Sequence, residues 1–95
     1  MDENKRELHF VFMNYDPEYE RLRSNRTKRG ENELDLYLSR KHDELLAKNL
    51  QPESYTKTLS LVIVDGFAVE ITNEQADVLR ASKEVRIVEK NQELA

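Results

Sequence analysis

The sequence predicts an α+β domain in which four antiparallel strands form one sheet and two helices cover one of its faces. Four short segments are rich in apolar residues that favour strands, and the second and third of them alternate at period two. Apolar residues recur at helical spacing in two longer segments. These segments follow one another in the order strand, helix, strand, strand, helix, strand. With 95 residues and 38% hydrophobic content the chain has enough apolar material for one core, so we expect residues 1–95 to be a single domain.

The first strand is expected over residues 8–13, which are aromatic or aliphatic for the most part and end before the polar turn at 14–17. Apolar side chains occupy both of its faces: Leu8, Phe10 and Phe12 on one, Val11 and Met13 on the other. Since the helices bury only one set, we expect the other to form an exposed apolar surface, and such surfaces usually mark docking sites. The alternative is that a flanking segment folds over it.

Residues 16–33 are expected to form a flexible loop, because apolar periodicity is lost there and five basic residues gather around a single glycine, Gly30. Asn25-Arg26-Thr27 in this stretch is an N-glycosylation sequon, so Asn25 is a candidate glycosylation site. The basic cluster is typical of a solvated surface. Binding to an anionic surface and proteolytic cleavage at Lys28-Arg29 are the alternatives.

A long helix is expected over residues 34–50, ending at Asn49 and before Pro52. Its apolar stripe consists of four leucines, Leu34, Leu38, Leu45 and Leu46. His42 lies at the edge of this stripe. Because protonation of a partly buried imidazole costs stability, His42 is a candidate pH sensor that loosens the domain as a secretory compartment acidifies. The alternative is a neutral histidine satisfied by hydrogen bonds.

The second strand is expected over residues 55–64, with strict alternation that puts four apolar side chains on one face: Tyr55, Leu59, Leu61 and Ile63. Asp65-Gly66 is a hairpin signal, since both residues tolerate a positive φ. The third strand then runs from Gly66 until its alternation stops at Thr72.

A second helix is expected from Thr72 to about residue 82, because Thr72 and Gln75 have the spacing of a capping box. The last strand covers residues 85–89. The complete βαββαβ order is that of the ferredoxin-like fold, which leaves one face of the sheet open to solvent or to a partner.

Composition narrows the function classes. A net charge of −4 with interspersed signs disfavours nucleic-acid binding, and no segment approaches the length needed to span a membrane. Cysteine is absent, no metal-ligand motif occurs, and no nucleophile is paired with a base, so we expect no disulfide, metal, cofactor or catalytic site.

Three segments carry a family resemblance. Residues 66–76 (GFAVEITNEQA), followed by 85–89 (VRIVE), closely resemble the inhibitor I9 domain, which is the propeptide of subtilisin-like serine proteases. Residues 42–46 (HDELL) are similar to the helix motif of plant-type subtilase propeptides. The resemblance implies that the open sheet face packs on two parallel surface helices of the protease. It also implies that the C-terminal tail, residues 91–95, enters the active-site cleft as an added strand.

The resemblance also implies which residues bind the protease. Glu89 matches the first of two acidic positions that cap the two protease helices, and Asn91 stands at the second, where Asp is usual. The amide still accepts a hydrogen bond but brings no charge. The remaining expected contacts belong to the tail: Gln92, Glu93, Leu94 and Ala95, with Leu94 suited to an apolar pocket. This tail ends short of the family's cleavage position, so it was trimmed or its last cleft contacts are missing.

By resemblance, the domain assists the folding of a subtilisin-like protease and then inhibits it. It is expected to be a monomer when free and to belong to the secretory pathway or the extracellular space, with no signal peptide in this chain. An excised propeptide and a free-standing inhibitor are both compatible with the sequence. A regulatory or dimerisation domain of the same fold is the alternative function, because an open apolar sheet face also suits a homodimer.

Overall fold

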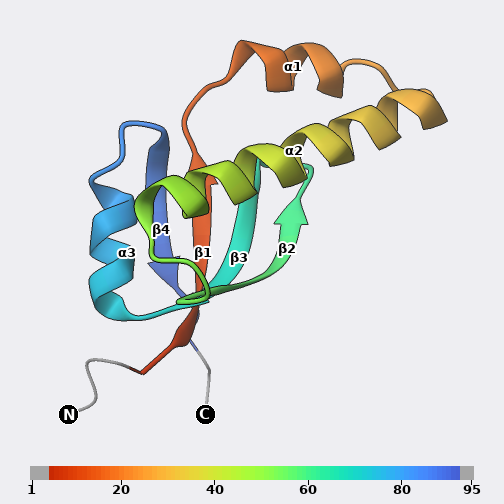
Figure 1. Ribbon diagram of the computed structural model, residues 1–95. Helices are drawn as coiled ribbons and strands as arrows, with labels where there is room; N and C mark the ends of the chain where they lie inside the picture. Colours follow the sequence, from red (N-terminus) through yellow and green to blue (C-terminus); the bar gives the residue numbers. More distant parts are fainter. Residues whose placement is uncertain (1–4, 93–95) are drawn as a thin grey trace.

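The computed structural model describes residues 5–92 and contains four strands and three helices in that range (Figure 1). In chain order these are β1 (Glu7–Met13), α1 (Pro17–Arg23), α2 (Lys28–Asn49), β2 (Thr56–Leu61), β3 (Gly66–Ile71), α3 (Asn73–Arg80) and β4 (Val85–Lys90). None of the described helices is long and apolar enough to cross a membrane.

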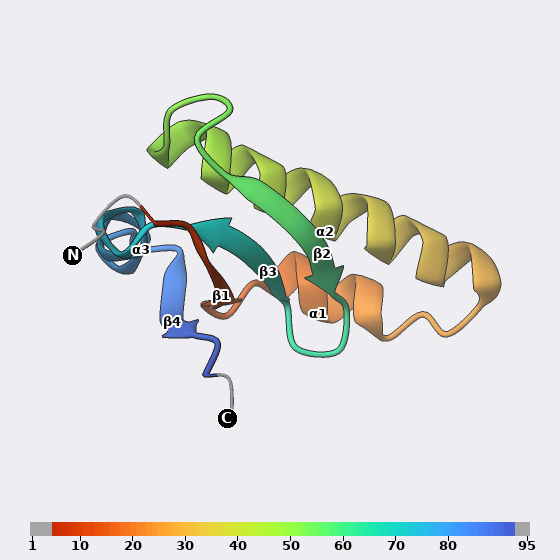
Figure 2. The same ribbon diagram turned by 90° about the horizontal axis from the view of Figure 1, so that it is seen from below.

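The strands form one antiparallel sheet in the order β2-β3-β1-β4 (Figure 1). Helices α2 and α3 lie on the same side of this sheet, and the view from below shows the strong twist that carries β2 away from β4 (Figure 2). The predicted α+β class, strand order along the chain and open antiparallel sheet are confirmed.

The main core lies between the sheet and helices α2 and α3. The inward faces of the two central strands supply fully buried side chains such as Val11, Phe67 and Val69, and Leu45 and Leu46 of α2 pack against them. All four leucines predicted for the apolar stripe of the long helix are buried. Burial on this face leaves the alternate residues of β1 on the opposite side, as the sequence predicted.

The expectation of a loop over residues 16–33 is wrong. Asp16 caps α1 with its side chain, and Pro17 occupies the first turn, where its missing N–H costs nothing. Thr27 caps α2 in the same way by accepting from the N–H of Gly30. The charged residues that hid the helical pattern form ion pairs along the helix surfaces, such as Arg21 with Glu18.

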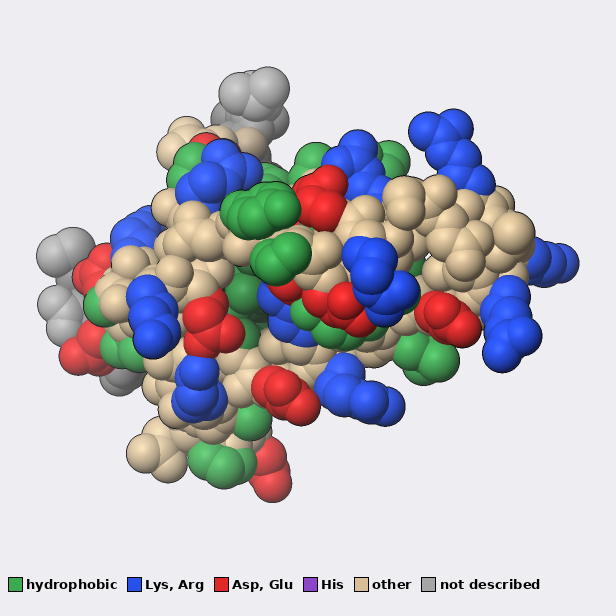
Figure 3. Space-filling model, turned by 90° about the horizontal axis from the view of Figure 1, so that it is seen from above, with side chains coloured by type: hydrophobic (Ala, Val, Ile, Leu, Met, Phe, Trp, Pro, Cys, Tyr) green, Lys and Arg blue, Asp and Glu red, His purple; other side chains and the backbone are tan. Residues whose placement is uncertain are grey.

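Helix α1 and the first half of α2 form a helical hairpin that extends past the end of the sheet (Figure 1). A second, smaller core holds the hairpin together and consists of Tyr19, Leu22, Leu34 and Leu38, with Tyr37 and Val62 packed against it. Seen from above, acidic and basic side chains are interspersed over the middle of the molecule, and basic side chains predominate at the right-hand end of the view (Figure 3).

Strand β2 is shorter than expected, and its alternation is broken. The register shifts between Lys57 and Leu59, so Lys57 and Ser60 both face α2. Leu59 is 48% exposed on the other face, and Ile63 is 79% exposed in the connection to β3. The strict two-residue period assumed for residues 55–64 is therefore wrong, because a bulge adds one residue and reverses the orientation of those that follow.

The turn before β3 and helix α3 agree more closely with the prediction. Asp65 has a positive φ of 45°, whereas Gly66 does not adopt positive φ. Helix α3 begins with the predicted capping box: the Thr72 hydroxyl accepts from the N–H of Gln75, and the Gln75 side chain accepts from the N–H of Thr72.

Candidate functional site

The sheet face opposite the helices is left uncovered by the described elements. Its side chains form three rows that cross β2, β3, β1 and β4 in turn. The rows are Leu61–Gly66–Phe12–Ile87, Leu59–Ala68–Phe10–Glu89 and Thr56–Glu70–Leu8–Asn91. We call this surface the open sheet face. Its central stripe is the apolar set of β1 that the sequence left unburied.

The open sheet face combines an apolar centre with acidic edges. Leu8, Phe10 and Phe12 are only half-buried, and Ile87 beside them is 37% exposed. Glu70 and Glu89 flank this stripe on β3 and β4, and both are exposed. The three rows contain no lysine or arginine. A surface of this kind is suited to an apolar partner with positively polarised groups at its rim.

The last strand leads from this face towards the C-terminus. The N–H of Asn91 donates to the carbonyl of Leu8 at 2.8 Å, so the ladder with β1 continues one residue beyond the end of β4. Glu89 and Asn91 therefore lie on the same side of the sheet, on the open sheet face. Gln92 is exposed, and Glu93, Leu94 and Ala95, for which cleft contacts were expected, lie outside the described residues.

An ion pair fastens the end of β4 to the beginning of β1. The Lys90 ammonium lies 3.0 Å from the Glu7 carboxylate, on the helix side of the sheet. The hydrogen bond from Lys90 holds the pKa of Glu7 below its usual value. Sequence reasoning missed this pair, because only the register of β1 against β4 brings the two residues together.

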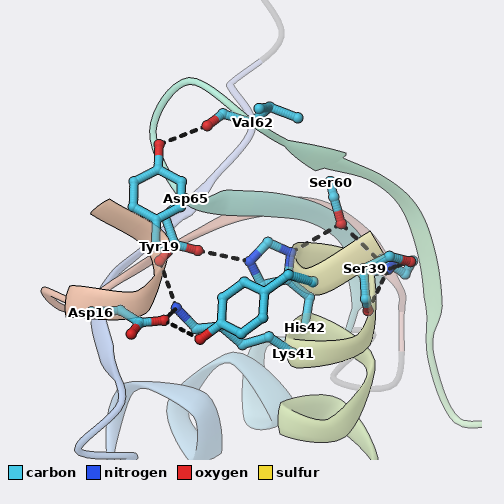
Figure 4. A network of polar contacts seen from close by, with 10 residues as sticks. Asp16, Tyr19, Ser39, Lys41, His42, Ser60, Val62 and Asp65 are labelled. Carbon is cyan, nitrogen blue, oxygen red and sulfur yellow. Dashed lines mark hydrogen bonds and ion pairs between the residues drawn. The ribbon is translucent and has the colours of Figure 1, made fainter. Parts of the chain in front are cut away.

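His42 lies at the centre of a buried polar network and not at the edge of the stripe (Figure 4). Its side chain is fully buried, and its Nε2 lies 2.9 Å from Oδ1 of Asp65. Its Nδ1 lies 2.9 Å from the hydroxyl of Ser60. Because a carboxylate only accepts hydrogen bonds, Nε2 carries the proton of the neutral ring and Nδ1 accepts from Ser60. Both ring nitrogens are thus satisfied.

The network extends from His42 to helix α1. Lys41 bridges two carboxylates, Asp65 at 2.6 Å and Asp16 at 2.9 Å, and the Tyr37 hydroxyl donates to Asp16 at 2.6 Å. Burial raises the pKa of Asp16, but the hydrogen bonds from Tyr37 and Lys41 outweigh this and hold it below its usual value. Burial, together with the bond to Asp16, raises the pKa of Tyr37.

A comparison with protein-family models matches residues 22–95 to peptidase inhibitor I9. The chain belongs to the peptidase inhibitor I9 family. No curated protein and no solved structure gave a match. The matched segment runs from within α1 to the last residue, so β1 lies outside it although β1 is the centre of the open sheet face.

Membership in the I9 family assigns the general role. I9 domains are inhibitory propeptides of subtilisin-like proteases, so this chain has the role of a propeptide and inhibitor, and its partner is a protease of that class. The domain is accordingly not an enzyme. Within residues 5–92, no group of three acidic, histidine or cysteine side chains is placed to hold a metal ion.

Asn25, the candidate glycosylation site of this I9 domain, lies in the exposed turn between α1 and α2. Its side-chain oxygen accepts from the N–H and hydroxyl of Thr27, at 3.1 Å and 2.8 Å. A Cβ at Gly30 would collide with the Asn25 side chain, which explains the glycine in the first turn of α2. Glycosylation of Asn25 stays a prediction.

Proposed function

We propose that this I9 domain inhibits a subtilisin-like serine protease by packing its open sheet face on the protease surface and placing its C-terminal tail in the active-site cleft. The observation that carries the proposal is the continuity of the two surfaces. The apolar stripe of β1 lies next to β4, and β4 continues through Asn91 towards the tail. Two paired strands, β1 and β4, thus present both contacts.

The two parts of this interface have different physical tasks. Burial of Phe10 and its apolar neighbours supplies affinity without much directionality. The tail supplies main-chain hydrogen bonds as an added strand, and its alternate side chains, Leu94 among them, fill the substrate pockets. Glu89 accepts hydrogen bonds at the positive end of a protease helix, and Asn91 does so without a charge.

We infer that the domain also assists folding of its protease. A partner that binds the folded protease and not the unfolded chain stabilises the folded state by mass action. The proposal further includes a monomeric free domain and a secretory or extracellular location, in keeping with the propeptides of its family. The likeness of residues 42–46 to plant-type propeptides supports a plant-type partner.

Substitution of one aromatic residue on the open sheet face tests the proposal. Phe10→Ser removes the central apolar contact, and Tyr15→Ser is the matched control because Tyr15 is 79% exposed outside the three rows. We expect Phe10→Ser to raise the inhibition constant against a subtilisin by about tenfold or more, with little change for Tyr15→Ser. Thermal unfolding of both variants shows whether they stay folded. Equal inhibition by both variants contradicts a role for this face.

Self-association is the second candidate function. The same apolar face favours it, because a two-fold dimer buries one patch against its own copy. Sedimentation velocity over a range of concentrations separates the two. A concentration-dependent dimer that is lost in Phe10→Ser, together with no inhibition of subtilisin at micromolar domain, favours the dimerisation function.

A further inference from the structure

We propose that Glu7 and Lys90 form a clamp that sets the direction in which the inhibitory tail leaves the sheet. The inference rests on the proposed function and deepens it, because it assigns positioning residues to the tail. Neither residue is among those that the family resemblance assigns to protease binding.

The position of the clamp supports this role. Lys90 is the last residue of β4, between Glu89 and Asn91, and Glu7 is the first residue of β1. Their side chains meet at 3.0 Å on the helix side of the sheet, while Glu89 and Asn91 face the other way. The ion pair is therefore placed to hold the strand without occupying the surface offered to the protease.

The clamp also lies next to the last hydrogen bond of the ladder. The N–H of Asn91 donates to the carbonyl of Leu8 at 2.8 Å, directly after Lys90 in one strand and Glu7 in the other. Strand ends open more easily than strand centres, because fewer contacts hold them. An ion pair at this point keeps the ladder closed and fixes the backbone from which the tail departs.

The energetic benefit is preorganisation. A tail that already points into the cleft loses less conformational freedom on binding than one that departs from a frayed strand end. The Lys90 side chain is 42% exposed and the Glu7 side chain is 29% exposed, so the ion pair is only partly shielded from solvent. We therefore expect a modest effect of about threefold on the inhibition constant when either charge is removed.

Charge removal and charge exchange test the clamp. Glu7→Gln and Lys90→Gln each raise the inhibition constant against a subtilisin about threefold, and the exchanged pair Glu7→Lys with Lys90→Glu recovers most of the loss. In a chain that lacks residues 91–95, the same substitutions leave the remaining inhibition unchanged. A merely structural role predicts equal losses with and without the tail, and a direct Lys90 contact with the protease predicts no recovery on exchange. Either result overturns the clamp.

A matched control and a measurement without protease complete the design. The exposed pair Lys48–Glu84 joins α2 to the turn before β4, away from the open sheet face, and its removal leaves inhibition unchanged. Amide hydrogen exchange at Asn91 is about threefold faster in Glu7→Gln than in the unmodified domain. Unchanged exchange there overturns the clamp. Absence of inhibition by the unmodified domain overturns the proposed function instead, and the exchange measurement still decides whether the ladder end is clamped.

Discussion

At the scale of single residues, Asp65 contributes both to the turn before β3 and to the buried polar network around His42. Its positive φ of 45° closes the connection between β2 and β3, and its carboxylate holds both Lys41 and His42. Its carbonyl accepts from the N–H of Met13. Only its backbone role was predictable from the Asp-Gly pair. The side-chain role depends on Lys41 and His42, which lie more than twenty positions earlier in the chain. A local turn motif does not predict contacts over that distance.

Removal of the Asp65 charge is expected to destabilise the domain. Asp65→Asn keeps a side chain that tolerates positive φ. It leaves the buried His42 without its carboxylate partner and the partly buried Lys41 with Asp16 alone, at a cost of about 2 kcal/mol. Urea unfolding measures the change. Glu53→Asn is the control, because Glu53 also has positive φ, at 65°, but is exposed and is expected to change stability by less than about 0.5 kcal/mol. Equal effects of the two variants contradict a role for the Asp65 carboxylate.

Asp16 gives the domain a defined sensitivity to acid. Its folded-state pKa is held below the ordinary value of 3.8, so its ionised form stabilises the fold above that value and the benefit is lost as the pH falls through the lowered pKa. We expect the unmodified domain to be more stable than Asp16→Asn at neutral pH. The difference shrinks as the pH falls from about 5 to about 2, measured by urea unfolding at each pH. A difference that stays constant over this range contradicts the assignment.

The role of His42 as a pH sensor is a prediction that the structure makes more specific. A second proton on the ring must enter at Nδ1, where Ser60 has to turn from donor to acceptor while it also accepts from Lys57 at 3.4 Å. The groups around the ring are Asp65 from the hairpin, Lys41 from α2 and Lys57 from β2. The Asp65 carboxylate is thus shared between the His42 ring and Lys41.

We predict that His42→Gln abolishes a loss of stability that the unmodified domain shows as the pH falls from neutral to mildly acidic values. Glutamine keeps one donor and one acceptor for Asp65 and Ser60 but does not take up a proton in this range. Unfolding and protease inhibition are both to be measured. Identical pH profiles of the two proteins in both measurements eliminate the switch.

At the scale of elements, the sequence predicts best those segments whose pattern is local. The strand at Gly66–Ile71, its junction to α3 and the capping box of Thr72 and Gln75 follow from spacing within one short peptide. Helix α1 was missed because its two buried side chains, Tyr19 and Leu22, are too few to show a period among charged neighbours. The bulge in β2 was missed because a one-residue insertion in a ladder has no local sequence signature here.

Tyr19 links helix α1 to the connection between β2 and β3, and the contribution of this contact can be measured. Tyr19 is 4% exposed, and its hydroxyl donates to the carbonyl of Val62 at 2.6 Å. Tyr19→Phe keeps the ring in the small core and leaves the carbonyl without this donor, at a cost of about 1 kcal/mol in unfolding free energy. Tyr15→Phe, at an exposed site, is expected to have no measurable effect. A Tyr19→Phe domain as stable as the unmodified one shows that this bond does not fasten α1.

At the scale of the whole molecule, one face of the sheet packs against the helices and forms the core, and the other face is open to a partner. One side of the sheet carries the main core, the network around His42 and helices α2 and α3. The apolar stripe with Glu70 and Glu89 lies on the other side. The sequence indicated this division through the two-sided apolarity of residues 8–13. It did not indicate the rows across four strands, because these depend on pairing between distant segments and on the bulge in β2.

The inhibition of a subtilisin-like protease by the intact domain tests the central claim most directly. Purified domain is titrated into a bacterial subtilisin or a plant subtilase, and residual hydrolysis of a small substrate is measured beside the same titration with residues 91–95 deleted. We expect tight inhibition that is competitive with substrate, and a marked loss of affinity on deletion, because the deletion removes the added strand and leaves only the sheet contact. No inhibition at micromolar domain, or inhibition that is equally strong without the tail, contradicts the account.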